Sequence, residues 1–272
     1  MLEDLLQFWF GQAKWFVAFA IGFGILTLFS PCNRGMTWWR TRQQVMSDLW
    51  YWFVVPLISR TFRIALFIVV FAVAFGTLDT EGISQSWSHG FGPAGELPLW
   101  GQILLVLLIQ DFVLYWLHRA FHTNAAWRYH AIHHSVEELD WTASMHFHPV
   151  NFLFQFCVAD VFVILLGFPG SALAAMAAFN TIYSAMVHAN LNWTFGPFKY
   201  LLASPVFHRW HHSHPSEGGN KNFASTFPFI DLLFGTFYMP KGRLPEDFGV
   251  TDPNFPSDFI GQMKYPIAKR LK

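Results

Sequence analysis

Long apolar stretches constrain the fold of this chain more than any other feature of its sequence. Five of them stand out, at Trp15–Phe29, Ile64–Leu78, Leu97–Leu117, Phe152–Phe168 and Ala172–Val187. A helix needs about 20 residues to cross the hydrocarbon core of a bilayer, and about 17 at the least. The third stretch meets this length, the fourth just reaches it, and the others need flanking residues. The sequence therefore predicts four to six membrane-spanning helices.

The overall composition agrees with a membrane location. Hydrophobic residues make up 53% of the chain and charged residues only 12%, whereas a typical soluble domain has about 25% charged residues. The net charge is zero, so nothing favours a nucleic-acid partner. Cys32 and Cys157 are far apart, which excludes a disulfide framework or a zinc ribbon. We expect an all-α, integral membrane helical bundle.

The distribution of basic residues predicts the orientation of the bundle. The short apolar stretch Leu49–Ile58 is expected to lie in the interface or to re-enter the membrane, within a basic segment, Pro31–Arg63. A turn at Gly167–Ser171 joins the fourth and fifth stretches as a hairpin. Threading five spans places every Lys and Arg except Lys14 on one side, which the positive-inside rule makes cytoplasmic. The histidine-rich segments fall on that same side.

We expect one membrane-embedded domain over residues 1–272, because the sequence shows no internal repeat or long linker. Residues 1–96 supply the N-terminal spans and the basic loop, residues 97–240 the histidine-rich core, and residues 241–272 a tail. The last 75 or so residues are less apolar but keep aromatic clusters such as Phe227–Tyr238. They are expected to form a helical cap on the cytoplasmic face of the membrane.

Three histidine motifs recur with helical spacing. They are HxxxH at His118 and His122, HxxHH at His130, His133 and His134, and HxxHH again at His208, His211 and His212. Positions i, i+3 and i+4 of a helix are neighbours on one face. Burying so many polar rings without partners would cost a few kcal/mol each, and a metal supplies those partners. Eight imidazoles suffice for two metal ions with four ligands each.

These motifs, in this order, resemble the fatty acid hydroxylase/sterol desaturase superfamily. The stretch from Asp111 to Tyr115-Trp-Leu-His118-Arg119 is similar to a family pattern, as are Lys221-Asn-Phe and Asp231-Leu-Leu-Phe-Gly-Thr-Phe. The resemblance covers about residues 97–240. It implies a non-haem di-iron oxygenase that hydroxylates or desaturates a lipid-like substrate of sterol, fatty acyl, sphingolipid, carotenoid or ether-lipid type with O2.

The resemblance also implies roles for individual residues. The eight motif histidines match iron ligands, and His188, after the fifth stretch, matches a further one. Some members carry a second HxxxH there, whereas this chain reads His188-Ala-Asn-Leu-Asn192. One metal would then keep an open or water-filled position, or Asn192 would bridge to it through water. Zinc stands above ferrous iron in the usual order of affinities, so zinc could replace iron in purified protein.

Several other polar residues are candidates for supporting roles. Asp111 lies seven residues before His118, on the same helical face, and could accept the second N–H of a ligand imidazole; the alternative is a helix–helix hydrogen bond. His148 is expected to support a ligand or to face the substrate, and His146 to lie at the surface. For Asp160, structural pairing and contact with a substrate headgroup both stay open.

The electron supply and two alternative functions complete the sequence-based hypotheses. The sequence has no GxGxxG on a strand–helix unit and no CxxC cluster, so a separate reductase or ferredoxin-type donor is expected. Basic residues including Arg34, Arg40 and Lys199 could form its docking face, or could simply reflect membrane topology. The alternatives are a zinc-dependent membrane lipid hydrolase, with Glu137 or Glu138 as general base, and a non-catalytic metal carrier or sensor.

Overall fold

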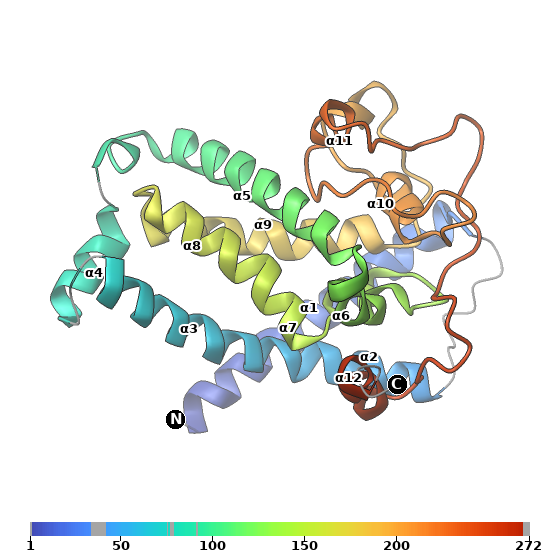
Figure 1. Ribbon diagram of the computed structural model, residues 1–272, viewed down its shortest axis with the longest axis horizontal. Helices are drawn as coiled ribbons and strands as arrows, with labels where there is room; N and C mark the ends of the chain where they lie inside the picture. Colours follow the sequence, from blue (N-terminus) through green and yellow to red (C-terminus); the bar gives the residue numbers. More distant parts are fainter. Residues whose placement is uncertain (1, 34–41, 75, 77–78, 91, 269–272) are drawn as a thin grey trace.

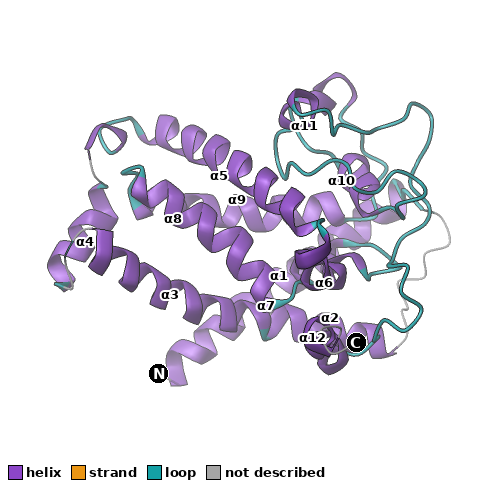
Figure 2. Cartoon of the chain, viewed as in Figure 1, coloured by secondary structure: helices purple, strands orange, loops and turns teal. Residues whose placement is uncertain are grey.

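The computed structural model describes residues 2–33, 42–74, 76, 79–90 and 92–268, and these residues form helices joined by loops (Figure 2). In the N-terminal half the helices are α1 (Leu2–Phe29), α2 (Arg42–Phe53), α3 (Val55–Ala74), α4 (Thr80–His89), the short 3-10 helix η1 (Gly92–Ala94), α5 (Leu99–Phe121) and α6 (Asn124–His134). They continue with η2 (Trp141–Met145), α7 (Pro149–Phe152), the π-helix η3 (Leu153–Cys157), α8 (Val158–Leu165), α9 (Gly170–His188), η4 (Gly196–Tyr200), α10 (Pro205–His212), α11 (Phe229–Leu233) and α12 (Phe259–Ala268). The all-α prediction is confirmed.

Four of the described helical segments are long and apolar enough to cross a membrane. They are Glu3–Phe29, Gln44–Val73, Leu99–Phe121 and Gly170–His188, and Pro149–Leu165 is a shorter apolar helix beside them. Large apolar side chains such as Ile21, Ile68 and Trp100 are exposed along these helices, as expected for surfaces that face lipid. The membrane-bundle prediction is therefore confirmed.

The second candidate span corrects one sequence-based expectation. The stretch Leu49–Ile58 was expected to be separate, but α2 and α3 run almost continuously (Figure 1). The backbone N–H of Val54 donates to Trp50 and that of Ile58 donates to Val54, so helical hydrogen bonds continue across the junction. Pro56 is tolerated there because it lies in the first turn of α3. As a result Arg63 lies within a helix and not in a cytoplasmic loop.

The core of the bundle joins four helices. Phe71 of α3, Val106 of α5, Val163 of α8 and Met176 of α9 belong to one buried cluster. The predicted hairpin between α8 and α9 is confirmed: Gly167 has φ +91°, a conformation that side chains disfavour. Gly170 begins α9 against Trp87, where a Cβ would lie only 2.1 Å from the indole. This hairpin fixes α9 beside α5 and α8.

One end of the bundle carries the histidine segments. The C-terminal ends of α5 and α9 lie near α6 and α10, at the end opposite α4 (Figure 1). The predicted cap is less helical than expected, because loops make up most of residues 189–258 and only η4, α10 and α11 are helical there. Hydrogen bonds from polar side chains, described below, hold these loops in place.

Candidate metal centre

The histidine motifs meet in two buried groups at this end of the bundle. The first group consists of His118, His122, His130, His134 and His211, and the second of His133, His188, His208 and His212. Within each group, one ring nitrogen per residue lies within 4.8 Å of the others. All nine histidines singled out in the sequence are thus brought together. Among the described residues, no carboxylate or thiolate joins either group.

The histidines divide into groups of five and four, and the eight motif histidines do not split into the expected four and four. Consecutive residues of an α-helix are about 100° apart around its axis, because a turn takes 3.6 residues. The adjacent pair His133 and His134 therefore diverges, and so does the pair His211 and His212, with ring planes at 89° and 87°. Each HxxHH motif contributes to both groups, so α6 and α10 lie across the whole centre.

Hydrogen bonds to the outer ring nitrogens fix the tautomers of several histidines. Nδ1 of His118 lies 2.8 Å from the carbonyl of Phe223, and Nδ1 of His188 lies 2.6 Å from the carbonyl of Ser184. A carbonyl can only accept, so both Nδ1 atoms carry the proton and both Nε2 atoms present a lone pair. Nδ1 of His130 donates in the same way to the amide oxygen of Asn151, at 2.7 Å.

The inner nitrogens are then too close to be stable without a cation. Nε2 of His118 lies 3.0 Å from Nε2 of His130, although neither atom has a proton to share. In the second group, Nε2 of His188 lies 2.9 Å from that of His208 and 3.3 Å from that of His133. In the first group two lone pairs therefore face each other and repel, and a metal ion would remove the repulsion by accepting them. The donor set in both groups therefore fits a metal that imidazole favours, such as iron or zinc.

Burial keeps these rings in the neutral form that binds metal. Desolvation lowers the pKa of His122 to about 3, and burial lowers the pKa of His133 and His208 well below the ordinary value. Neighbouring histidines lower it further because charged rings would repel one another. Neutral imidazole is the ligand form of histidine, so both groups are prepared for metal at neutral pH.

The loop at residues 220–227 supports the first group from the cap. The carbonyls of Phe223 and Lys221 accept from Nδ1 of His118 and His211, and Asn220 accepts from Nδ1 of His122. Asn222, buried with φ +59°, donates to the carbonyls of Phe207 and Tyr238 and anchors the loop. These partners explain why polar residues occur at this position in the sequence.

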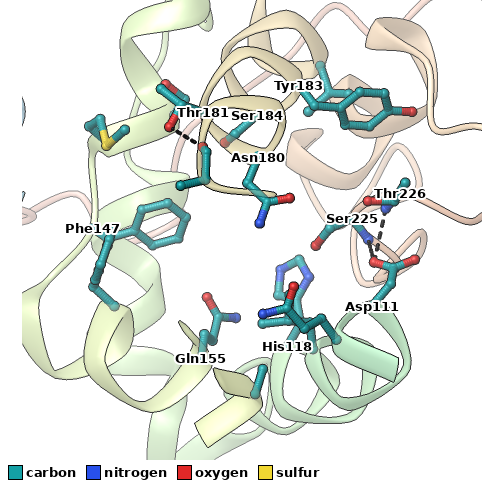
Figure 3. A pocket seen from close by; sticks show the side chains of 18 of the residues that line it. Asp111, His118, Phe147, Gln155, Asn180, Thr181, Tyr183, Ser184, Ser225 and Thr226 are labelled. Atoms are coloured by element: carbon teal, nitrogen blue, oxygen red, sulfur yellow. Dashed lines mark hydrogen bonds between the residues drawn. The ribbon is translucent and has the colours of Figure 1, made fainter. Parts of the chain in front are cut away.

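Asp111 acts on this loop and not on a histidine. Its carboxylate accepts from the backbone N–H groups of Ser225, Thr226 and Phe227 at 2.6–3.0 Å (Figure 3). The expected hydrogen bond to a ligand imidazole is wrong, because Nδ1 of His118 is bonded to the carbonyl of Phe223 and not to Asp111. Asp231 accepts from the N–H groups of Phe223 and Ala224 in the same manner. Two carboxylates thus hold the loop whose carbonyls orient His118 and His211.

Three further expectations fail for positional reasons. His148 caps α7 by accepting from the N–H of Val150, and its ring lies beside Tyr129, away from both groups. Asn192 is exposed, and its backbone N–H donates to Ser30, so it does not reach the centre. His146 is buried and not at the surface, with its ring nitrogens 3.0 Å from Asp48 and Gln262.

Sequence reasoning missed the residues that orient the ligands from behind. Asn151 and Asn220 accept from His130 and His122, and three backbone carbonyls accept from other ligands. A backbone carbonyl has no signature in a sequence. Asn151 follows the His148-Pro149 pair closely enough that a polar residue early in an apolar stretch could have pointed to it.

A cavity of about 230 Å³ opens from the histidine groups into the bundle. His118 of the first group and His133, His188 and His208 of the second line one part of it. Leu107, Leu173, Ala177 and other apolar residues of α5 and α9 line much of the rest. Polar residues occur among them, as Figure 3 shows for Gln155, Asn180 and Thr181. The cavity therefore connects the candidate metal centre with the interior of the membrane-spanning helices.

Comparison with known proteins identifies the family. Residues 103–236 match the model of the fatty acid hydroxylase family, and this segment contains all nine histidines of the two groups. The chain belongs to the fatty acid hydroxylase/sterol desaturase superfamily. This confirms the resemblance drawn from the histidine motifs.

Individual relatives are lipid-modifying enzymes by name. Ornithine lipid hydroxylase OlsE of Rhizobium tropici is 31% identical over 201 residues, which cover 74% of this chain and 60% of that protein. Alkylglycerol monooxygenase of Xenopus tropicalis is 33% identical over 55% of this chain and 33% of its own length. Methylsterol monooxygenase 2-2 of Arabidopsis thaliana is 30% identical over 54% of this chain and 58% of its own length. No solved structure matches the chain significantly.

Proposed function

We propose that the chain is a membrane-bound oxidoreductase that hydroxylates or desaturates a lipid-like substrate with O2 at a di-iron centre. The observation that carries the proposal is the pair of buried histidine groups with inner Nε2 atoms 2.9–3.3 Å apart, open to a cavity among membrane-spanning helices. The relatives are named as an ornithine lipid hydroxylase, an alkylglycerol monooxygenase and a methylsterol monooxygenase, and these names support the same reaction class.

The residues of this chain hold and shape the centre. The first group would hold one iron ion through five imidazoles and the second another through four. When bound, iron supplies the oxidising chemistry with O2 that no side chain possesses. The ligand rings are oriented by Asn151, Asn220 and the backbone carbonyls that accept from Nδ1. Loss of such a partner typically lowers metal affinity or activity by about 10–100-fold. The apolar residues of the cavity wall, such as Leu107, Leu173 and Ala177, would accommodate a lipid-like molecule.

We further propose that the centre lies on the cytoplasmic side and takes electrons from a separate reductase or ferredoxin-type protein. The basic residues that flank the spans support this orientation. Arg60 and Arg63 do not count toward it, since both lie within the candidate span Gln44–Val73. Of the basic residues suggested for docking, Arg34 and Arg40 lie outside the described residues, and Lys199 lies on η4 beside Tyr200.

A zinc-dependent hydrolase fits this site less well. Catalytic zinc sites usually take three protein ligands and keep one position for water, whereas the groups here offer five and four imidazoles. The suggested bases Glu137 and Glu138 line a different cavity, of about 280 Å³, together with Asp48 and His146. Neither glutamate lines the cavity next to the ligands.

The decisive experiment measures metal content and lipid-dependent O2 consumption on protein purified from iron-supplemented cells. We expect about two iron ions per chain, one for each histidine group, and O2 consumption that needs both a reductant and a lipid extract. Protein that binds zinc at low stoichiometry and releases fatty acid without consuming O2 would instead establish a hydrolase. Stable metal binding without either activity would establish a carrier or sensor.

A further inference from the structure

Two carboxamide side chains face the cavity without a partner. Gln155 lies in the π-helix η3 and Asn180 in the middle of α9, and both amide groups point into the space beside His118 (Figure 3). Gln155 is only 4% exposed, whereas Asn180 is exposed on α9. Within the part of the chain that the structure describes, neither side chain makes a hydrogen bond to another residue. Thr181, which follows Asn180 on α9, donates to the carbonyl of Ala177.

An unpaired amide at the buried Gln155 is unfavourable for stability alone. Leaving a buried donor or acceptor unsatisfied costs about 1–3 kcal/mol, and the neighbours of Gln155 include the apolar Leu153 and Phe154. A leucine or methionine would fill the same space without that cost. The π-helical turn that presents Gln155 is itself rare and occurs frequently at functional sites. A ligand that pairs with the amides accounts for both observations.

The charges around the cavity define what kind of ligand fits. Arg63 and Asp160 also line it, and they form an ion pair in which Gln110 donates to the other oxygen of Asp160 at 2.8 Å. This cation and this anion are paired, and the carboxylate of Asp111, which also lines the cavity, accepts from three backbone N–H groups, so no unpaired charge is left among the described residues of the wall to bind a charged group. Each free carboxamide presents N–H donors and a carbonyl acceptor. The complement is an uncharged group that both donates and accepts, such as a hydroxyl or a secondary amide.

We propose that Gln155 and Asn180 bind an uncharged hydroxyl or amide group of the lipid substrate and so determine which carbon is presented to the metal centre. This inference rests on the proposed oxidation of a lipid at that centre. Since His118, His133 and His188 line the same cavity, the bound polar group lies near the ligands. The oxidised carbon then belongs to the region of the lipid around that group, and a plain hydrocarbon chain is a poor substrate.

Binding of two probes tests the proposal without turnover. The full chain, loaded with metal in nanodiscs and kept anaerobic without reductant, is titrated with a saturated monoalkylglycerol ether and with the alkane of the same chain length. We expect Gln155→Met and Asn180→Leu each to weaken binding of the ether about fivefold, since a neutral hydrogen bond contributes about 1 kcal/mol. Binding of the alkane is expected to stay within twofold or to improve.

Controls separate this role from a structural one. Thr181→Val removes a cavity hydroxyl that is already paired with Ala177, and it is expected to change neither affinity by more than about twofold. Equal losses for ether and alkane, or no loss in either variant, would overturn the proposal. The two variants lie on different helices, so one remains informative if the other fails to retain metal. Metal content and O2 consumption of the unaltered chain report separately on the proposed function.

Discussion

The two histidine groups differ in how they are supported and in what they face. In the five-histidine group, His118, His122, His130 and His211 each donate from Nδ1 to an amide or backbone oxygen. In the four-histidine group only His188 does so, and the buried Nδ1 atoms of the other three have no hydrogen-bond partner in the described part of the chain. Three of the four line the cavity, against one of the five.

This difference suggests a division of labour between the groups. The five-histidine group is anchored from outside by the loop at residues 220–227 and by Asn151, which favours tight retention of its metal. The four-histidine group has one ligand fewer and lies along the cavity wall. For the proposed oxidation, this difference favours the four-histidine group as the one next to the substrate, with the five-histidine group completing the pair.

Acidification should affect both groups and is the largest change we expect. Because burial lowers the histidine pKa values, the unfolded chain binds more protons than the folded chain below about pH 6.5, the ordinary histidine pKa. The metal-free chain should therefore lose stability as pH falls below about 6.5. The contribution of His122 is lost progressively down to its folded-state pKa of about 3. Thermal unfolding across this range measures the effect. The metal-loaded chain, whose rings are held neutral, should unfold only at lower pH, and identical profiles would contradict metal binding.

Removing one ligand from each group should give unequal losses. His208→Ala leaves three imidazoles in the cavity-facing group, so we expect loss of one metal ion and a decrease in lipid oxidation of more than ~100-fold. His122→Ala leaves four imidazoles in the other group, and His122 is only half-buried, so a smaller decrease is expected. Metal content and product formation are measured on both variants. The reverse order would contradict the division of labour.

The support behind the five-histidine group can be tested at Asn151. Asn151→Leu removes the acceptor for Nδ1 of His130 while nearly preserving shape, and metal affinity is expected to fall by about 10–100-fold. Asn192→Leu is the matched control, because the Asn192 side chain is exposed and has no hydrogen bond to a histidine in the described part of the chain. Competition with a chelator measures both. Equal effects of the two substitutions would show that Asn151 does not orient the ligand.

The smallest effect is expected at Asp111. In Asp111→Asn one carboxylate oxygen becomes an NH2 group that faces backbone N–H donors, so a decrease in stability of about 1–3 kcal/mol is expected. Metal loss should be limited to the five-histidine group, through the carbonyl of Phe223. Denaturation and metal content are measured against Glu96→Gln, an exposed control. A direct role in catalysis would instead lower turnover without lowering stability.

Local spacing was sufficient to predict what depends on local geometry. Apolar stretches indicated the spans, and i, i+3 and i+4 spacing brought the motif histidines to one centre. The roles of Asp111 and Asn192 could not be predicted, because they depend on contacts with Phe227 and Ser30, which lie more than a hundred residues away in sequence. The ion pair of Arg63 with Asp160 also required the continuous α2–α3 segment to form. That residues 1–272 form a single domain stays a prediction.

The divergence of the adjacent histidines on α6 and α10 has a mechanical consequence. On each of these helices the adjacent histidines place one ring in each group, so the separation of the two centres is set by the angular step between consecutive residues of a helix. Neither centre can be moved or rotated alone, because any tilt of α6 shifts His133 and His134 together. The distance between the two centres is therefore fixed by the backbone of α6 and α10. Point substitutions of side chains leave that backbone geometry unchanged.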